Sequence, residues 1–166
     1  VKALDGLLVA GGREDVLLIV PQVAFHQIHA QLIGSDGWNH PEVARNSYAT
    51  GAVFVAKYYD QSDIQSVRQF VDTFRTRFRR DQSIAGALGH DGMLAVLTAL
   101  NAGGTSRSLL QQQLEELGSI PGATGRISFN KGNRENAWMY LLNIRGGKIM
   151  PLTDGLDIEP VPVIDR

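Results

Sequence analysis

The stretch that decides the fold opens with DGLLVAGGREDV (Asp5–Val16) and closes with LIGSDGWNHPE (Leu32–Glu42). Each segment carries a short apolar run, then a glycine-containing turn, then residues that can begin a helix. A short apolar run closed by turn residues predicts a buried strand. The repetition of this pattern therefore predicts alternating strands and helices.

The spacing of apolar residues extends this alternation. Asn39 and Glu42 resemble a capping box for a short helix, with Pro41 in its first turn. Pro21 is expected to kink the first long helix or limit its first segment. The predicted elements are strands at Asp5–Ala10, Leu32–Asp36 and Gly51–Lys57, with a helix at Arg13–Ala30. Strand–helix–strand–helix–strand is typical of a parallel sheet with covering helices.

Three further helices and a hairpin are predicted downstream. A capping box of Ser62 and Gln65 begins the first helix, and Thr105 is expected to cap the third. Glycines end the second and third helices. The predicted segments are helices from Ser62 to Phe78, from Ser83 to Leu100 and from Thr105 to Gly118, a strand at Gly125–Phe129, a turn at Asn130–Asn133, and a hairpin of Trp138–Ile144 with Lys148–Met150.

Composition excludes several function classes. The 166 residues include 16 Lys and Arg against 17 Asp and Glu, so the net charge is −1. Near-zero charge argues against a nucleic-acid binder and against a polybasic membrane-surface protein. The chain has no Cys, which excludes thiolate zinc sites, disulfides and thiol catalysis.

The first residue is Val1 and no signal peptide is visible, so we expect a fragment or a processed product.

The turns after the first two strands carry the candidate ligand site. Parallel sheets bind ligands in the crevice at the carboxyl ends of their strands. Glycines in these turns let a ligand approach the backbone, Asp36 offers a carboxylate for an ammonium or hydroxyl group, Trp38 offers a flat apolar wall, and Arg13 offers a cationic fork. The alternative is that Asp36-Gly37 is only a turn and that Trp38 packs on a neighbouring helix. The candidate residues are Gly11, Gly12, Arg13, Asp36, Gly37 and Trp38.

Other polar residues do not form an enzyme or metal signature. His26 and His29 lie three residues apart without a matching carboxylate, so solvated or capping histidines are expected. His90 and Asp91 are adjacent on a helix and are not expected to face each other. No nucleophile elbow, phosphate-binding loop or dinucleotide fingerprint occurs. The sequence therefore predicts no catalytic residue, no cofactor and no metal site.

Taken in order, eight segments resemble the C-terminal half of a type I periplasmic binding protein, and in particular the solute-binding proteins of branched-chain amino-acid ABC transporters. They cover nearly the whole chain. The segments are DGLLVAGGREDV (Asp5–Val16), Pro21-Gln22, LIGSDGWNHPE (Leu32–Glu42), GAVFVAKYY (Gly51–Tyr59), FVDTFRTRF (Phe70–Phe78), GHDGMLAVLTAL (Gly89–Leu100), ATGRISFNKGN (Ala123–Asn133) and LLNIRGGKIMPL (Leu141–Leu152).

The resemblance implies an incomplete three-layer αβα fold with a mainly parallel sheet. In that family two α/β lobes close on a ligand. Residues 1–56 would belong to the second lobe and 57–136 to the first, 137–152 would cross back, and 153–166 would form an extended tail. The N-terminal half of the same protein would be missing.

The resemblance also implies an extracytoplasmic solute-binding component of an ABC transporter that works by hinge closure. Its partners would be a transporter permease and a small polar ligand such as an amino acid, whose ammonium Asp36 would hold. Ala10 and Gly12 are smaller than the family's usual residues, and His90 stands where a Tyr is usual. The alternatives are a regulatory or sensor module, such as a penicillin-binding protein activator, and more distantly a flavodoxin-like enzyme fragment.

Overall fold

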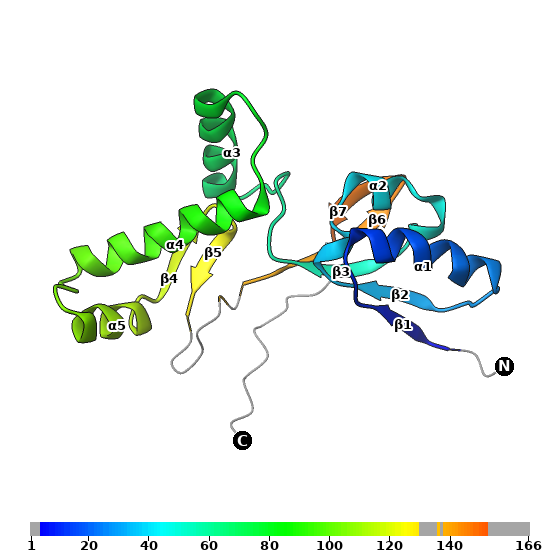
Figure 1. Ribbon diagram of the computed structural model, residues 1–166, viewed down its shortest axis with the longest axis horizontal. Coiled ribbons are helices and arrows are strands. Elements are labelled where there is room, and N and C mark those ends of the chain that lie inside the picture. The colour runs from blue at the N-terminus through cyan, green and yellow to red at the C-terminus, as the bar shows by residue number, and fades with distance from the viewer. Residues whose placement is uncertain (1–3, 130–135, 137, 153–166) are drawn as a thin grey trace, which may run out of the picture. The chain divides into compact units, whose positions relative to one another are not determined.

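The computed structural model describes residues 4–129, 136 and 138–152, and these form two compact units. Unit 1 comprises Val1–Ala56 and Met139–Arg166, and unit 2 comprises Lys57–Trp138. Figure 1 labels the elements of both units. The assignment of these units to the two lobes of the family stays a prediction. The turn expected at Asn130–Asn133 and the tail at 153–166 lie outside the described residues.

Unit 1 is built on a five-stranded mixed sheet of order β1-β2-β3-β6-β7. Its first three strands are parallel, as the strand–helix alternation predicts, whereas β6 and β7 run antiparallel to their neighbours. The strands are β1 (Gly6–Val9), β2 (Gln31–Gly34), β3 (Val53–Ala56), β6 (Tyr140–Arg145) and β7 (Lys148–Pro151). The mixed α/β fold class expected from the sequence is therefore confirmed.

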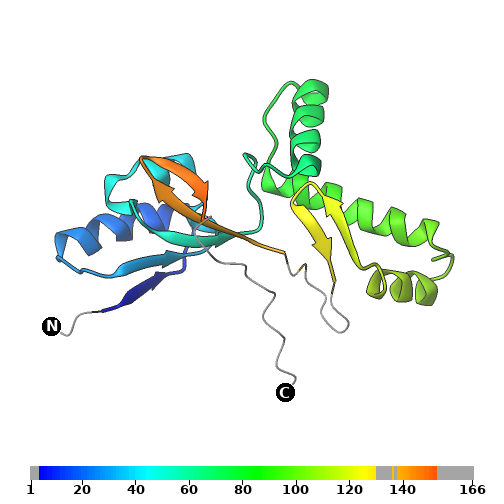
Figure 2. The ribbon, with the colours of Figure 1, turned by 180° about the vertical axis from the view of Figure 1, so that it is seen from behind.

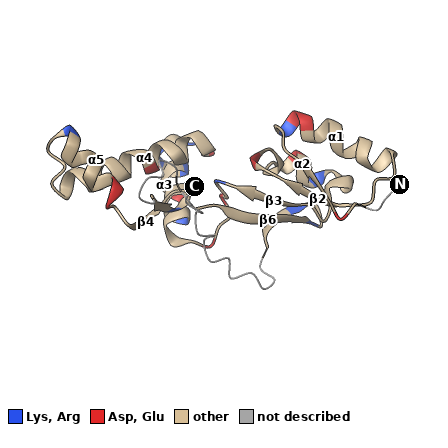
Figure 3. Cartoon of the chain, turned by 90° about the horizontal axis from the view of Figure 1, so that it is seen from below, with Lys and Arg blue, Asp and Glu red and all other residues tan. Residues whose placement is uncertain are grey.

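Helices α1 (Arg13–Phe25) and α2 (Pro41–Arg45) lie on the same face of this sheet, as Figures 1 and 3 show. Val16, Val20 and Val23 form the buried side of α1. The helix continues beyond Pro21 but ends five residues before the expected end at Ala30. It ends there because Gln27 takes a left-handed conformation, with φ of 53°.

The β6–β7 hairpin closes through Arg145-Gly146-Gly147-Lys148, as expected. Gly146 and Gly147 both have positive φ, of 57° and 75°. A two-residue hairpin turn of the primed type requires positive φ at both central positions, which glycine adopts without strain.

Unit 2 combines three helices with a two-stranded antiparallel sheet. Its elements are α3 (Gln65–Phe78), α4 (Ile84–Asn101), α5 (Arg107–Glu115), β4 (Ser119–Gly122) and β5 (Gly125–Ser128). The core consists of Tyr58, Val67, Val71, Ala87 and Ala123. Strand β4 was not predicted, because Pro121 and Gly122 are disfavoured in strands and mask the signal.

Several helix caps differ from the expected ones by one or two residues. His40, not Asn39, caps α2, and its Nδ1 accepts a hydrogen bond from the Glu42 amide at 3.2 Å. Ser106, not Thr105, caps α5 by accepting from the Leu109 amide. The Ser62 hydroxyl accepts from the Ile64 amide ahead of α3, so the expected Ser62–Gln65 capping box is wrong.

The buried side of α4 consists of small residues and one carboxylate, namely Ala87, Asp91, Ala95 and Ala99. Leu88, Leu97 and Leu100, which mark the helix in the sequence, are 44%, 49% and 44% exposed. Alanine occupies the contact because a side chain of one carbon lets α4 approach the rest of unit 2 closely.

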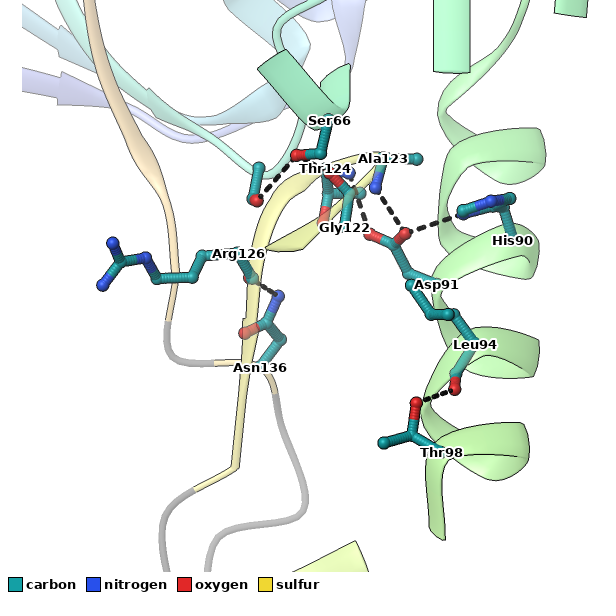
Figure 4. Close-up of polar contacts among 11 residues, drawn as sticks. Ser66, His90, Asp91, Leu94, Thr98, Gly122, Ala123, Thr124, Arg126 and Asn136 are labelled. Carbon is teal, nitrogen blue, oxygen red and sulfur yellow. Dashed lines mark hydrogen bonds and ion pairs between the residues drawn. The ribbon is translucent and has the colours of Figure 1, made fainter. Parts of the chain in front are cut away.

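Asp91 holds the turn between β4 and β5 (Figure 4). The residue is 5% exposed, and its carboxylate accepts hydrogen bonds from the Ala123 amide at 2.5 Å, the Thr124 amide at 2.8 Å and the Thr124 hydroxyl at 2.6 Å. His90 Nδ1 lies 3.0 Å from the same carboxylate. The expectation that His90 and Asp91 do not face each other is wrong, because the turn donors fix the carboxylate within reach of the neighbouring ring.

We predict that Asp91→Asn lowers the free energy of unfolding by about 1.5–3 kcal/mol, the range for a hydrogen bond to a charged group. The amide nitrogen of Asn would face donors where a carboxylate oxygen now accepts. Thermal denaturation followed by circular dichroism measures the effect. Asp72→Asn, an exposed acid on α3, is the matched control and should leave the melting temperature unchanged. Equal melting temperatures for the two variants would contradict the assignment of Asp91 as the holder of the turn.

Candidate functional site

The turns that follow β1 and β2 lie in direct backbone contact. A Cβ placed on Gly37 would stand 2.0 Å from the Gly11 carbonyl oxygen and 2.9 Å from the Gly12 carbonyl carbon. Parallel strands end at the same edge of a sheet, which explains why two segments some 25 residues apart meet here. The structure therefore brings the candidate glycines of both turns together.

The buried side chain of Trp38 connects the turn after β2 to the end of β1. Its side chain is fully buried, and its Nε1 donates a hydrogen bond of 2.9 Å to the carbonyl oxygen of Val9, the last residue of β1. Gly34, the last residue of β2, leaves room for the ring, since a Cβ there would lie 2.2 Å from it. Because its side chain is fully buried, Trp38 does not offer a ligand the expected flat apolar wall, and its contacts are with the strand residues Val9 and Gly34.

Asp36 remains at the surface of the same turn. It opens the short 3-10 helix η1 (Asp36–Trp38), and its carbonyl oxygen accepts from the Asn39 amide at 3.0 Å. The residue is exposed, unlike Trp38 two positions later. Within this three-residue helix, Trp38 is part of the core and Asp36 is exposed to solvent.

Arg13 forms a half-exposed ion cluster with acidic neighbours at this edge. Its guanidinium lies 3.4 Å from the Glu14 carboxylate and 3.8 Å from that of Glu42, which is also 3.8 Å from His40 Nδ1. Exposed pairs of this kind contribute little to stability, about 0–1 kcal/mol. The sequence pattern assigned Glu42 only to a helix cap; its place directly after Pro41 and four residues after Trp38 was the available signal for a site residue.

The first turn of α1 is acidic. The Gly12 amide donates to Asp15 Oδ2 at 3.0 Å, and Glu14 is the other acidic residue of this turn. Figure 3 shows acidic and basic residues together at one end of α1. A carboxylate at this position satisfies a free amide of the helix start and interacts favourably with the helix dipole. Together with Asp36 and Glu42, these groups make the edge of the sheet suited to a cationic or hydrogen-bond-donating group of a ligand.

The remaining candidates lie apart from this edge. His26 is the C-cap residue of α1, and its ring contacts Phe25. Among the described residues, no group of three or more His, Asp or Glu side chains is arranged to hold a metal ion.

In unit 2, burial, reinforced by the charges of Asp60 and Asp63, raises the pKa of Tyr59.

The sequence profile of a family described as periplasmic binding protein matches residues 2–148 of the chain. No curated protein matches the chain by sequence.

Solved structures of similar fold come from several bacteria. A putative branched-chain amino acid ABC transporter protein from Rhodospirillum rubrum superimposes with a TM-score of 0.80 at 19% identity, over 89% of this chain and 44% of its own. A leucine-binding protein from Thermotoga maritima gives 0.69 at 18% identity, over 89% and 43%. The branched-chain amino acid substrate-binding protein LivJ of Streptococcus pneumoniae, in complex with isoleucine, gives 0.64 at 22%, over 87% and 42%. The chain thus spans less than half the length of these proteins.

We predict that Gly37→Ala destabilises the chain by about 1–3 kcal/mol, the usual cost of forcing an extra carbon into a packed contact. The new methyl group would collide with the Gly11 backbone and separate the two turns. Gly92→Ala in α4 is the matched control, because a Cβ there meets no atom within 4 Å. Removing a helical glycine should stabilise that variant by about 0.5–1 kcal/mol. Urea denaturation measures both; a Gly37→Ala variant as stable as the unsubstituted chain would disprove the close contact.

Proposed function

The chain belongs to the periplasmic binding protein family, and from this we propose that it is part of the solute-binding component of an ABC transporter. The proposed ligand is an amino acid or a similar small polar molecule. The observation that carries the proposal is the exposed residue Asp36 on a turn in backbone contact with the Gly11-Gly12 turn.

The chemistry of this edge supports a ligand with an ammonium group. Among the described residues named at this edge, the carboxylates of Asp36, Glu14, Asp15 and Glu42 accompany the cation Arg13. A carboxylate that accepts a hydrogen bond from an ammonium makes a charge-assisted bond, which is shorter and stronger than a neutral one. The candidate residues Gly11, Gly12 and Gly37 would let the ligand approach the backbone, whereas Trp38 would act only by holding the turns together.

Binding would be completed by a second wall that this chain does not supply. In the proposed mechanism, two lobes close around the ligand and the closed state makes contacts that the open state lacks. The ligand carboxylate would be held by the portion of the fold that the matched structures have beyond this chain. The protein would work outside the cytoplasmic membrane and deliver its ligand to a permease.

The alternative role is a regulatory or sensor module of the same fold. Such a module would use its outer surface and tolerate a cleft without polar groups. The exposed charged groups at the ends of β1 and β2 favour solute binding over this alternative.

None of the described helices has the length and apolar character of a membrane span.

We predict that Asp36→Asn in the full-length gene product weakens binding of leucine or isoleucine at least about tenfold, which corresponds to about 1.4 kcal/mol. The substitution keeps the shape of the side chain and removes the charge that the ammonium requires. Isothermal titration calorimetry measures the affinity. Asp72→Asn, which removes the charge of an exposed acid on α3 that is not a candidate ligand residue, is the control and should stay within about twofold. An unchanged affinity of the Asp36→Asn variant would exclude the proposed ammonium contact.

The 166-residue chain alone should bind these amino acids with a dissociation constant above about 1 mM, because half of the enclosing wall is absent. The same calorimetric titration tests this. Micromolar binding by the isolated chain would show that the edge of unit 1 forms a complete site by itself.

A further inference from the structure

The C-terminal end of α3 carries a dense cluster of arginines. Arg75, Arg77, Arg79 and Arg80 lie within six residues, and the segment from Phe74 to Arg80 contains no acidic residue. All four arginines are exposed, and we call them the arginine cluster. This end of α3 lies away from β4 and β5 in both views of Figures 1 and 2. The near-zero charge of the whole chain therefore hides a strongly positive surface on one helix.

Ion pairing within the chain neutralises little of this charge. Arg75 Nε lies 2.9 Å from Asp81 Oδ1, whereas the side chains of Arg77 and Arg79 form no ion pair or hydrogen bond with any residue that the structure describes. The Arg80 guanidinium lies over the Phe74 ring, 5.9 Å from its centroid. A cation over an aromatic face keeps its full charge. Among the described residues, only the first of the four charges is thus paired with an acid.

The backbone at Arg79 shows that ending a helix does not account for the whole cluster. Arg79 is the C-cap of α3 and takes the left-handed conformation, with φ of 54° and ψ of 30°. Glycine adopts this conformation without strain and is the usual residue there. Cations in the last turn interact favourably with the helix dipole, which accounts for Arg75 and Arg77 but not for an arginine at a left-handed cap. The side chain of Arg79 therefore points to a role outside the helix.

An exposed aromatic ring accompanies the arginines. Phe70, Phe74 and Phe78 follow one side of α3, with successive ring centroids 5.7 and 4.6 Å apart. Phe70 packs against the core of unit 2, whereas Phe78 is 53% exposed. Basic residues beside an exposed phenylalanine on an amphipathic helix are typical of binding to a bilayer interface. Guanidinium groups bind phosphate through two hydrogen bonds, and the ring enters the apolar boundary beneath the headgroups.

We propose that the arginine cluster and Phe78 dock unit 2 on a membrane surface that contains anionic phospholipids. Four arginines on an amphipathic helix reach the number that recognises anionic headgroups, and each contributes about fivefold to the binding constant. The cluster belongs to unit 2 and Asp36 to unit 1, so this docking requires no amino-acid ligand. Under the proposed function, residence at the bilayer raises the concentration of the protein beside its permease.

Sedimentation with lipid vesicles tests the proposal on the 166-residue chain. Vesicles of equal parts phosphatidylglycerol and phosphatidylcholine should bind the chain at low salt, at least about tenfold more tightly than vesicles of phosphatidylcholine alone. Salt at about 1 M should release most of the chain, because the Debye length falls to about 3 Å. The combined substitution Arg77→Gln, Arg79→Gly and Arg80→Gln should weaken binding about a hundredfold, at about fivefold for each arginine.

Two single substitutions form a matched pair, because each removes one exposed cation from unit 2. Arg79→Gly should weaken binding about fivefold, whereas Arg107→Gln, outside the cluster, should change it less than about twofold. Circular dichroism should show that Arg79→Gly melts no earlier than the unsubstituted chain, since glycine relieves the left-handed cap. A loss of vesicle binding by this variant is then not a loss of folding.

Equal vesicle binding by the two single variants would overturn the proposal, and so would the absence of binding to phosphatidylglycerol vesicles. Binding of poly-glutamate that is as tight, per unit charge, as binding of the vesicles would also overturn it, because the cluster would then fit an acidic protein surface. The assay contains no amino-acid ligand, so a failed membrane proposal and a failed ligand proposal are distinguishable.

Discussion

The contact between the backbone at Gly37 and the backbone at Gly11 is the constraint on which unit 1 depends. It requires a residue without a side chain, because the Gly11 carbonyl oxygen occupies the space that a Cβ would take. It also requires a group that holds the two turns together, and the bond from Trp38 Nε1 to the Val9 carbonyl does so. The ends of β1 and β2 are thereby held at one place, and the start of α1 and the carboxylate of Asp36 are positioned beside them.

Unit 2 uses the same physical device with a different residue. Asp91 is buried and accepts three hydrogen bonds from Ala123 and Thr124, just as buried Trp38 donates one across unit 1. A buried polar group is costly unless it is satisfied, so each of these side chains specifies the turn that satisfies it. In unit 2 the turn between β4 and β5 is thus held by a carboxylate from α4, and in unit 1 the end of β1 is held by the indole of Trp38.

Local patterns predicted most elements of the chain, because apolar spacing, glycine and proline act over a few residues. They predicted β1, β2, β3, α3, α4 and the β6–β7 hairpin to within a few residues. They failed where the choice depended on partners distant in sequence. Helix α1 ends early because Gln27 takes a left-handed conformation. The buried side of α4 is set by the close packing of its alanines. The N-cap of α2 is His40, not the expected Asn39. The sequence predicted that two turns carry the candidate site. It did not predict that, within Asp36–Trp38, Trp38 is buried and Asp36 is exposed.

The sequence by itself determined the alternation of strands and helices, the turns that carry Gly11, Gly12, Arg13, Asp36 and Gly37, and the resemblance to the family. Only the tertiary structure decided that Trp38 is buried and bonded to Val9, that His90 contacts Asp91, and that Leu8, Ile33 and Val55 are exposed on their strands. The physical reason is that burial and hydrogen bonding are properties of pairs. A residue type limits which partners are possible, and the folded arrangement of distant segments selects among them.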